Sequence, residues 1–340
     1  MNSKPASSLE RVKESVMRIL RTREIPVATA FVVLVAVTAF VNPRFLAPQS
    51  VKDLMLNATI IAILAAGQSI VIISRNVDLS VGSMLGISGF AVGTLFVAFP
   101  EIPIPLVFVS GIVIGAVLGA ANGFLVAIIK VPSLVITLGT LYVFRGINNA
   151  WAGGTEYFSG QRPKEFGDLS VETIYGLPII TIMALVVIVS MGIFLSRARS
   201  GRDYYAIGSD PAAAELFGIP VAKRVFFAFV LSGALAGLAG VLWASRFSSV
   251  GARTGLGVEL DVVAAVVVGG VAIFGGSGTV IGASIGALLL TTITSSLTAV
   301  QVDKFWQQAV VGVLIISAIV IDRVSALRAA RKRKGERSNV

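Results

Sequence analysis

The stretch PLVFVSGIVIGAVLGAANGFLVAII at residues 105–129 decides the fold class of this 340-residue chain. It carries no charged residue, and about 20 apolar residues suffice for a helix to cross the hydrocarbon core of a bilayer. Its glycines recur every fourth residue, at Gly111, Gly115, Gly119 and Gly123, and so share one helical face. Small residues at this spacing let two membrane helices approach closely. The stretch therefore predicts a membrane-spanning helix with one tightly packed face.

The composition extends this prediction to the whole chain. Apolar residues make up 55% of the sequence and charged residues only 14%, against about 25% charged in an ordinary soluble domain. The mean hydropathy is +0.89. These values exclude a water-soluble globular domain, and they exclude a disordered chain, which needs low hydrophobicity. We therefore expect an all-α polytopic membrane protein.

About ten transmembrane helices are predicted from the apolar segments. The charged residues Arg145, Glu259 and Asp261 fall near the expected ends of these segments, where charge costs less than at the bilayer centre. The predicted spans are residues 27–41, 57–74, 79–99, 105–129, 133–150, 177–195, 226–243, 259–275, 278–299 and 306–321.

The distribution of basic residues predicts the orientation. With both termini in the cytoplasm, 20 of the 28 Lys and Arg residues lie on the inner side, as the positive-inside rule requires. This orientation accounts for the net charge of +10, so nucleic-acid binding is not needed to explain it. We expect a cytoplasmic segment at 1–26 with an amphipathic surface helix, a transmembrane domain at 27–321, and a basic cytoplasmic tail at 322–340 held near anionic membrane lipid.

Two segments of the chain resemble each other. Residues 115–125 read GAVLGAANGFL and residues 278–288 read GTVIGASIGAL, with six of eleven positions identical. In the predicted topology the two segments run in opposite directions, as in an inverted repeat that pairs spans two to five with spans seven to ten. The alternative is that both segments acquired the same spacing of small residues independently, without an internal repeat.

Several residue types that carry chemistry are missing from the sequence. There is no Cys and no His, which removes the usual thiolate nucleophile, general base and metal ligands. No Lys follows a Gly, so the phosphate-binding G-x-x-x-x-G-K-[ST] loop does not occur. We predict a non-enzymatic chain with no catalytic residue, no metal site and no cofactor of its own. ATP and Mg²⁺, if used, bind another chain.

The longest polar break on the cytoplasmic side is residues 196–224. Asp210 suits the N-cap of a helix, Pro211 its first turn, and Gly218 its end, which predicts a helix of at most two turns. So short a helix is unstable alone and must pack on its own bundle or on a partner. A plain connector is the alternative reading.

At this loop the sequence resembles the permeases of ABC importers, through Ala213-Ala214-Glu215 followed by Gly218-Ile219. The rest of the chain resembles their monosaccharide branch, the ribose/xylose/arabinose-type permeases. The matching strings are NVDLSVGS at 76–83, VPS at 131–133, TLGTL at 137–141, GLGVELD at 255–261, VGG at 268–270 and GGSG at 275–278. Together they cover roughly residues 40–321 in the family's order.

The resemblance implies that the loop is a coupling helix that docks on a cytoplasmic ATP-binding subunit. The residues assigned to that coupling are Arg202, Asp210, Pro211, Ala213, Ala214, Glu215, Gly218 and Ile219. The order Ala-Ala-Glu departs from the Glu-Ala-Ala of the older importer consensus, which leaves the acidic contact open. The other implied partners are a periplasmic sugar-binding protein, a second permease chain and a small-molecule sugar, at the bacterial inner membrane.

The substrate class has alternatives. The segment around Trp151, Gly153 and Gly154 is similar to permeases for rhamnose or for the furanosyl autoinducer, which favours that branch. A branched-chain amino-acid ABC permease shares the architecture. An ion-coupled secondary transporter would be expected to carry carboxylates or His at mid-bilayer, and the sequence shows no clear case.

Ten polar residues are candidates for the translocation pathway or its gates. Six of them also have a plainer explanation: a helix cap for Asp78 and Ser80, interhelical hydrogen bonds for Gln68, Asn122 and Thr140, and a snorkelling side chain for Arg145. Glu259 and Asp261 are expected to cap or gate the outer end of the eighth span. The full set is Gln68, Asp78, Ser80, Asn122, Thr140, Arg145, Asn148, Asn149, Glu259 and Asp261.

Overall fold

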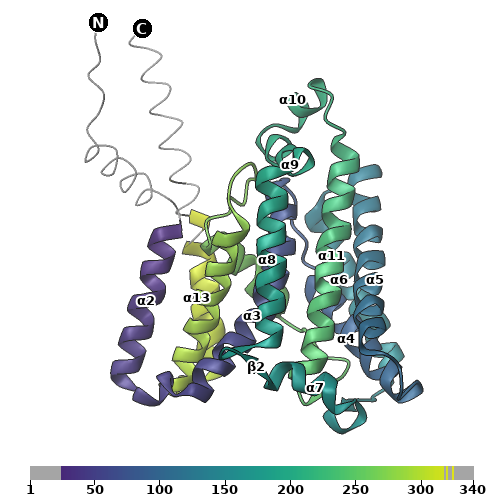
Figure 1. Ribbon diagram of the computed structural model, residues 1–340. Helices are drawn as coiled ribbons and strands as arrows, with labels where there is room; N and C mark the ends of the chain where they lie inside the picture. Colours follow the sequence, from purple (N-terminus) through teal and green to yellow (C-terminus); the bar gives the residue numbers. More distant parts are fainter. Residues whose placement is uncertain (1–23, 318, 321–323, 325–340) are drawn as a thin grey trace, which may run out of the picture.

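The computed structural model describes residues 24–317, 319–320 and 324, and these residues are mostly helical (Figure 1). The predicted surface helix before residue 24 and almost all of the basic tail lie outside the described residues. Of the helices in the described part, six are long and apolar enough to cross a membrane. They are α3 (Pro48–Ile73), α4 (Val81–Ala98), α5 (Ile104–Gly123) with its π-helical continuation η2 (Phe124–Ile128), α8 (Ile179–Arg197), α11 (Val221–Arg246) and α13 (Val280–Ala299).

Four further helices overlap the remaining predicted spans. They are α2 (Glu24–Val41), α6 (Ser133–Ala152), α12 (Val258–Val268) and an unlabelled helix over Lys304–Ser317. The short elements are the helices α7 (Lys164–Val171), α9 (Arg199–Ser209) and α10 (Pro211–Leu216), with 3₁₀ turns η1 (Pro43–Leu46) and η3 (Ser159–Gln161). Strand β1 (Tyr157–Phe158) pairs antiparallel with β4 (Ser249–Val250), and β2 (Thr173–Ile174) with β3 (Leu177–Pro178).

The predicted eighth span, residues 259–275, is wrong as a continuous helix. Helix α12 has 11 residues and ends at Val268, which makes it about 16 Å long, half the thickness of the hydrocarbon core. Beyond it, Gly270, Gly275 and Gly276 take left-handed φ angles of 89°, 85° and 75°. Glycine reaches these angles without strain, but an α-helix does not contain them. The chain therefore turns back as a glycine loop at residues 269–279.

Two helices begin before the membrane spans predicted for them. Helix α3 begins at Pro48, ahead of the span 57–74, and α11 begins at Val221, ahead of the span 226–243. Each extension carries a charged residue with a partner: Asp53 pairs with Arg246, and Arg224 pairs with Asp203.

The short helices define the two ends of the bundle (Figure 1). Helices α9 and α10 lie at one end, called here the α10 end, and α7 with the β2–β3 hairpin lies at the other, the α7 end. The core is centred on α3, which is buried almost without interruption from Leu56 to Ile73. Helices α5 and α8 bury only part of their surface and expose Val, Leu and Ile side chains.

The glycine stripe of α5 packs directly on α11. A Cβ added at Gly115 would lie 2.1 Å from the Gly233 carbonyl oxygen, and one added at Gly119 would lie 2.2 Å from the Phe229 carbonyl oxygen. Gly123 in turn lies against Phe226, so the two helices are antiparallel. The predicted close approach of two helix backbones is therefore present, with α11 as the partner.

The helices that carry the two similar segments run in opposite directions. Helix α5 ends beside Phe226, near the start of α11 at the α10 end. Helix α13 ends at Ala299, whose carbonyl accepts a hydrogen bond from the Asn42 side chain just before α3 begins. The start of α3 lies at the α7 end, because its Asp53 pairs with Arg246 in the last turn of α11.

Candidate functional site

Helix α10 is capped at both ends, as the sequence predicts. The Asp210 side chain accepts hydrogen bonds from the backbone N–H groups of Ala212 and Ala213 at 3.0 and 3.1 Å. At the other end Gly218 has a φ of +78°, and the N–H groups of Gly218 and Ile219 donate to the carbonyls of Glu215 and Ala214. This is a Schellman ending, which satisfies the last carbonyls of the helix. A six-residue helix is thus held in place by its own termini.

The tip of α10 exposes two large apolar side chains that sequence reasoning missed. Leu216 is 88% exposed and Phe217 is 87% exposed, next to the exposed Glu215. Ala214 is the residue of this helix that is buried against the rest of the chain, and Ile219 packs beside the core. The spacing alone did not distinguish the outward from the inward face, because a helix of two turns shows too little periodicity.

Helix α9 joins α10 to the bundle and was not predicted. Its buried residues Gly201, Tyr204 and Ile207 recur at helical spacing, which is the signal that could have identified it. A Cβ added at Gly208 would lie 1.8 Å from the Ile73 carbonyl oxygen and 2.4 Å from the Gly276 backbone nitrogen. The end of α9 therefore rests on both the end of α3 and the glycine loop after α12.

Polar contacts fix α9 on its neighbours. Asp203 forms an ion pair of 2.8 Å with Arg224 in the first turn of α11, and the Tyr205 hydroxyl donates to the Gly278 carbonyl at 3.0 Å. Burial raises the pKa of Tyr204 to about 12, so its hydroxyl stays neutral. Arg202, a predicted coupling residue, is exposed and donates to the carbonyl of Arg197 at 3.2 Å.

The first group of predicted pathway residues surrounds the α3–α4 loop, residues 74–80. Ser80 donates through its backbone N–H and its hydroxyl to the Asp78 carboxylate at 2.9 and 2.6 Å, and Asn122 donates to the Ser80 hydroxyl oxygen at 2.8 Å. The Gln68 amide, with its oxygen facing the Asp78 N–H at 3.1 Å, donates to the Asp78 carbonyl at 3.3 Å. All four residues are fully buried. They hold the loop inside the bundle, and Asn122 bonds from α5 to this loop rather than to another helix.

The second group joins α6 to residues 252–259. Arg145 donates to the Thr254 carbonyl at 2.5 Å, and Asn148 donates to the Ala252 carbonyl at 3.4 Å. Arg145 and Glu259 are 9% and 8% exposed, and they lie against Gly86 and Gly82 of α4, respectively. Arg145 therefore points into the bundle, so the snorkelling interpretation is wrong.

Glu259 and Asp261 lie in the first turn of α12, and the Glu259 carboxylate accepts a hydrogen bond from the Gly257 N–H at 3.3 Å, as expected of a residue that caps this end. Glu259 also faces the first turn of α4 inside the bundle, because the chain re-enters the bundle through residues 247–257 before α12 begins. Thr140 donates only to its own helix at Thr137 and Asn149 is exposed on α6, so these two residues join neither group.

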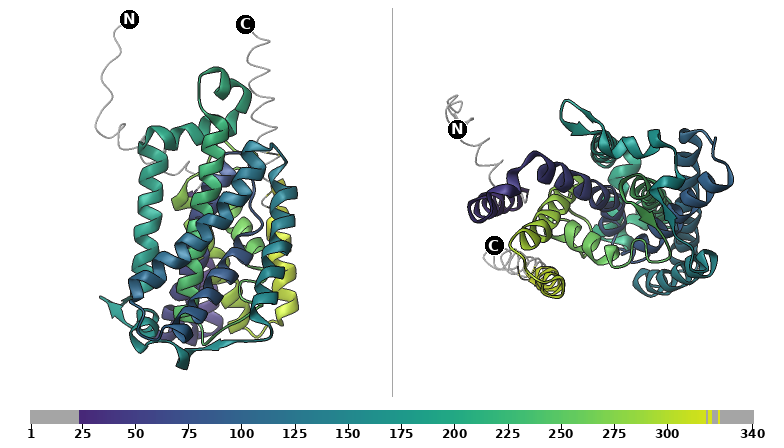
Figure 2. Two further views of the ribbon diagram at one scale, coloured as in Figure 1. Left: turned by 90° about the vertical axis from the view of Figure 1, so that its right-hand side faces the viewer. Right: turned by 90° about the horizontal axis from the view of Figure 1, so that it is seen from below.

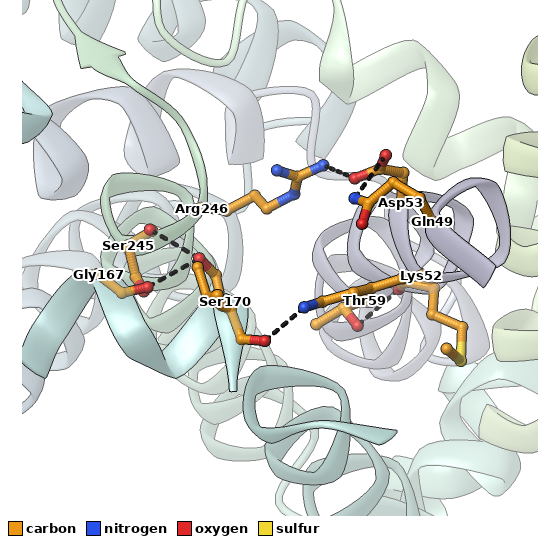
Figure 3. Close-up of polar contacts among 10 residues, drawn as sticks. Gln49, Lys52, Asp53, Thr59, Gly167, Ser170, Ser245 and Arg246 are labelled. Atoms are coloured by element: carbon orange, nitrogen blue, oxygen red, sulfur yellow. Dashed lines mark hydrogen bonds and ion pairs between the residues drawn. The ribbon is translucent and has the colours of Figure 1, made fainter. Parts of the chain in front are cut away.

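A polar network closes the α7 end (Figure 3). Arg246 donates to the Asp53 carboxylate at 2.7 Å, Gln49 donates to the same carboxylate at 3.1 Å, and Lys52 donates to the Val171 carbonyl. These contacts tie α3 to α7 and α11 around a cavity of about 600 Å³. Sequence reasoning singled out none of these residues.

Comparison with known proteins identifies the family. Residues 50–319 match the family described as "Branched-chain amino acid transport system / permease component". The chain belongs to this permease family. It is 36% identical over 305 residues to the autoinducer 2 import system permease protein LsrC of Enterobacter sp. (strain 638), covering 89% of this chain and 88% of that one. It is 34% identical over 315 residues to the LsrC of Escherichia coli O9:H4 (strain HS), covering 93% and 90% of the two chains.

The LsrC of Klebsiella pneumoniae subsp. pneumoniae is also 34% identical, over 304 residues that cover 89% of this chain and 87% of that one. No solved structure matches the chain. The family and the apolar helices together make this permease a multi-pass protein of the inner membrane and a transport component rather than an enzyme.

Proposed function

We propose that this chain is the membrane permease subunit of an ATP-driven, binding-protein-dependent importer of a monosaccharide-like solute. The observation that carries the proposal is the tip of α10, where Leu216 and Phe217 are almost fully exposed on a rigidly capped helix. Adjacent large apolar residues exposed at the polar end of a membrane protein mark a protein interaction site. We assign this tip to a cleft on the ATP-binding subunit, which would hold the ATP and Mg²⁺.

We infer the substrate class from the names of the relatives. These relatives are named as autoinducer 2 import permeases, which supports a furanosyl or other monosaccharide-like solute for this chain. The family description names branched-chain amino acids instead, so an amino acid is the second candidate. The sequence similarity to the monosaccharide branch, which extends over most of the chain, favours the sugar.

The proposed orientation places the α10 end in the cytoplasm and the α7 end in the periplasm. It is supported by the basic residues of the 196–224 loop, which lies at the α10 end. The helix directions at α5 and α13 support an inverted repeat of spans two to five and seven to ten, within a ten-helix topology that has both termini inside.

The translocation pathway is proposed to run between two permease chains. Helix α6 exposes Gly139, Tyr142, Gly146 and Asn149 in one row among larger apolar side chains, and no neighbouring element lies within 4 Å of a Cβ added at either glycine. Small residues in such a row allow another helix to approach closely. A second permease, identical or related, would cover this face and leave Thr140 and Asn149 at the pathway.

Purification of the complex in mild detergent tests the proposal. Wild-type permease is expected to bring down an ATP-binding subunit and a second permease chain, whereas a Leu216→Asp/Phe217→Asp variant inserts normally but loses the ATP-binding subunit. Lys223→Ala, an exposed change two residues into α11, serves as the control that retains it. Recovery of an equal amount of ATP-binding subunit with the double variant would contradict the assignment of α10.

A further inference from the structure

Two buried side chains of opposite charge lie near each other in the bundle without forming an ion pair. Arg145 of α6 is 9% exposed and Glu259 of α12 is 8% exposed, and in the described part of the chain no nitrogen of Arg145 lies within 4.0 Å of a Glu259 oxygen. We infer that Arg145 and Glu259 form a direct ion pair in a second state of the transport cycle, and so switch α6 between two positions. The inference rests on the proposed function, which supplies that cycle.

Both charged groups are only partly satisfied in the structure. The Nη1 atom of Arg145 donates to the carbonyls of Thr254 and Ala252 at 2.5 and 3.4 Å, whereas its buried Nε and Nη2 atoms have no partner. The Oε1 atom of Glu259 accepts from the Gly257 N–H at 3.3 Å, whereas its buried Oε2 atom has no partner. Buried charges are costly unless they are paired. The unpartnered donors of Arg145 and the unpartnered acceptor of Glu259 are complementary.

Two glycines of α4 place these side chains one helical turn apart. A Cβ added at Gly82 would lie 2.2 Å from the Glu259 Oε2 atom, and one added at Gly86 would lie 3.2 Å from the Arg145 Nη1 atom. Four residues correspond to about 6 Å along a helix axis. A shift of α6 against α12 by less than one turn therefore brings the guanidinium to the carboxylate. The same close contacts leave no space for a solute between α4 and either side chain.

The sequence at the start of α12 explains why Glu259 is short of donors. Residues 77–81 at the start of α4 read VDLSV, and residues 258–262 at the start of α12 read VELDV. In the first segment the Ser80 hydroxyl donates to the Asp78 carboxylate at 2.6 Å. In the second, Asp261 takes the place of that serine, and an ionised carboxylate has no proton to donate. Glu259 therefore depends on a donor from another helix.

Helix α12 connects Glu259 to the α10 end. The glycine loop at residues 269–279, which follows α12, is held by α9: the Tyr205 hydroxyl donates to the Gly278 carbonyl at 3.0 Å, and a Cβ added at Gly208 would lie 2.4 Å from the Gly276 nitrogen. Glu259 lies at the other end of the same 11-residue helix. A displacement of α9 by the ATP-binding subunit would therefore reach Glu259 through one short helix.

The other partner of the switch lies on the helix that is proposed to border the pathway. Helix α6 lies at the edge of the bundle, where it contacts mainly α4 (Figure 2). Arg145 and Asn148 are on its buried side, whereas Tyr142 and Asn149 are on its exposed side. A change of partner at Arg145 therefore moves the exposed side of α6, and with it the wall of a pathway between two permease chains.

Cryo-EM structures of the assembled wild-type complex test the inference without any substitution. The complex is compared without nucleotide and after trapping with ATP and vanadate. We expect the shortest distance from the Arg145 guanidinium to the Glu259 carboxylate to fall below about 4 Å, the limit for an ion pair, in one of the two states only. A longer distance in both states, a shorter one in both, or a water molecule that bridges the two groups in both would overturn the inference.

A double-mutant cycle tests whether the two residues act as a pair. Arg145→Gln and Glu259→Gln should each lower the ratio of solute-stimulated to unstimulated ATP hydrolysis by about tenfold. The double variant should lose no more than Arg145→Gln alone, because the pair is already broken. Arg253→Gln and Glu101→Gln, which change exposed residues, are the matched controls and should retain the wild-type ratio. Losses that multiply in the double variant would overturn the inference.

The two experiments also separate the inference from the proposed function. Assembly of each variant is checked by gel filtration and recovery of the ATP-binding subunit, and the wild-type cryo-EM comparison decides alone if a variant does not assemble. A wild-type complex that imports the solute but shows no change between Arg145 and Glu259 would remove the switch and leave the importer. A wild-type chain that recruits no ATP-binding subunit would contradict the proposed function, and the inference with it.

Discussion

Replacing Gly115 by alanine should destabilise the permease by forcing α5 away from α11. The added Cβ would lie 2.1 Å from the Gly233 carbonyl oxygen and 2.7 Å from the Gly237 backbone nitrogen. Ordinary contact distances are about 3.5 Å, so the helix backbones must separate by more than about 1 Å. Both obstructing atoms belong to backbone, which cannot rotate away as a side chain can.

The magnitude follows from a matched control. Gly192→Ala places the same methyl group in the interior of α8, where nothing lies within 4 Å of the new Cβ. Both variants gain the same helix propensity, up to about 1 kcal/mol, so the difference between them isolates the steric cost. Overpacking of a close contact costs about 1–3 kcal/mol in the free energy of unfolding. At about 2–4 °C per kcal/mol, Gly115→Ala should melt several degrees below Gly192→Ala.

The assay is thermal unfolding of the GFP-tagged permease in mild detergent, read as the fraction that remains monodisperse after heating. Gly192→Ala is expected to melt at or above the wild-type temperature. If Gly115→Ala melted as high as Gly192→Ala, the direct backbone contact of α5 with α11 would be refuted.

Three further changes test the α10 end and the α3–α4 loop. Asp210→Ala removes the cap of α10 and should cost about 0.5–2 kcal/mol of local stability, seen as faster amide hydrogen exchange in α10 alone. Arg224→Ala breaks the part-buried pair with Asp203 and should lower coupling, measured as sugar-stimulated ATP hydrolysis, more than it lowers the melting temperature. Asn122→Ala removes the buried bond to the α3–α4 loop and should lower the melting temperature through a loss of about 1–3 kcal/mol.

The Asp210 and Arg224 changes each have a control with an opposite expectation. Asp210→Asn retains a capping oxygen and should exchange like wild type. Lys223→Ala removes a neighbouring basic residue that has no partner within the described chain, and its coupling should be normal. Equal loss of coupling in Lys223→Ala and Arg224→Ala would mean that basic charge, rather than the ion pair, matters at the start of α11.

The sequence predicts the membrane spans well where apolar residues are continuous. The segment 105–129 coincides with α5 and its π-helical end, and its glycine spacing predicts the close helix contact. The prediction fails at residues 259–275 because hydropathy does not distinguish an apolar helix from an apolar glycine loop. The left-handed angles at Gly270, Gly275 and Gly276 reflect tertiary packing as much as local preference.

The candidate functional residues also divide into those that the sequence places correctly and those that need the fold. Asp210 and Gly218 are local signals, because each acts on its own helix, and the structure has both caps where the sequence predicts them. The ten polar residues required tertiary information, since Asp78 and Arg145 belong to separate groups in the fold. The exposure of Phe217 depends on the positions of the neighbouring elements, which periodicity does not report.

The most direct test of the importer assignment is ATP-driven uptake in proteoliposomes that contain the purified complex. With ATP enclosed at the α10 side and the binding protein outside, we predict accumulation of a radiolabelled monosaccharide, with no accumulation of leucine. The Leu216→Asp/Phe217→Asp variant should abolish this uptake. Leucine accumulation instead of sugar, or sugar uptake that persists without ATP under an ion gradient, would contradict the account.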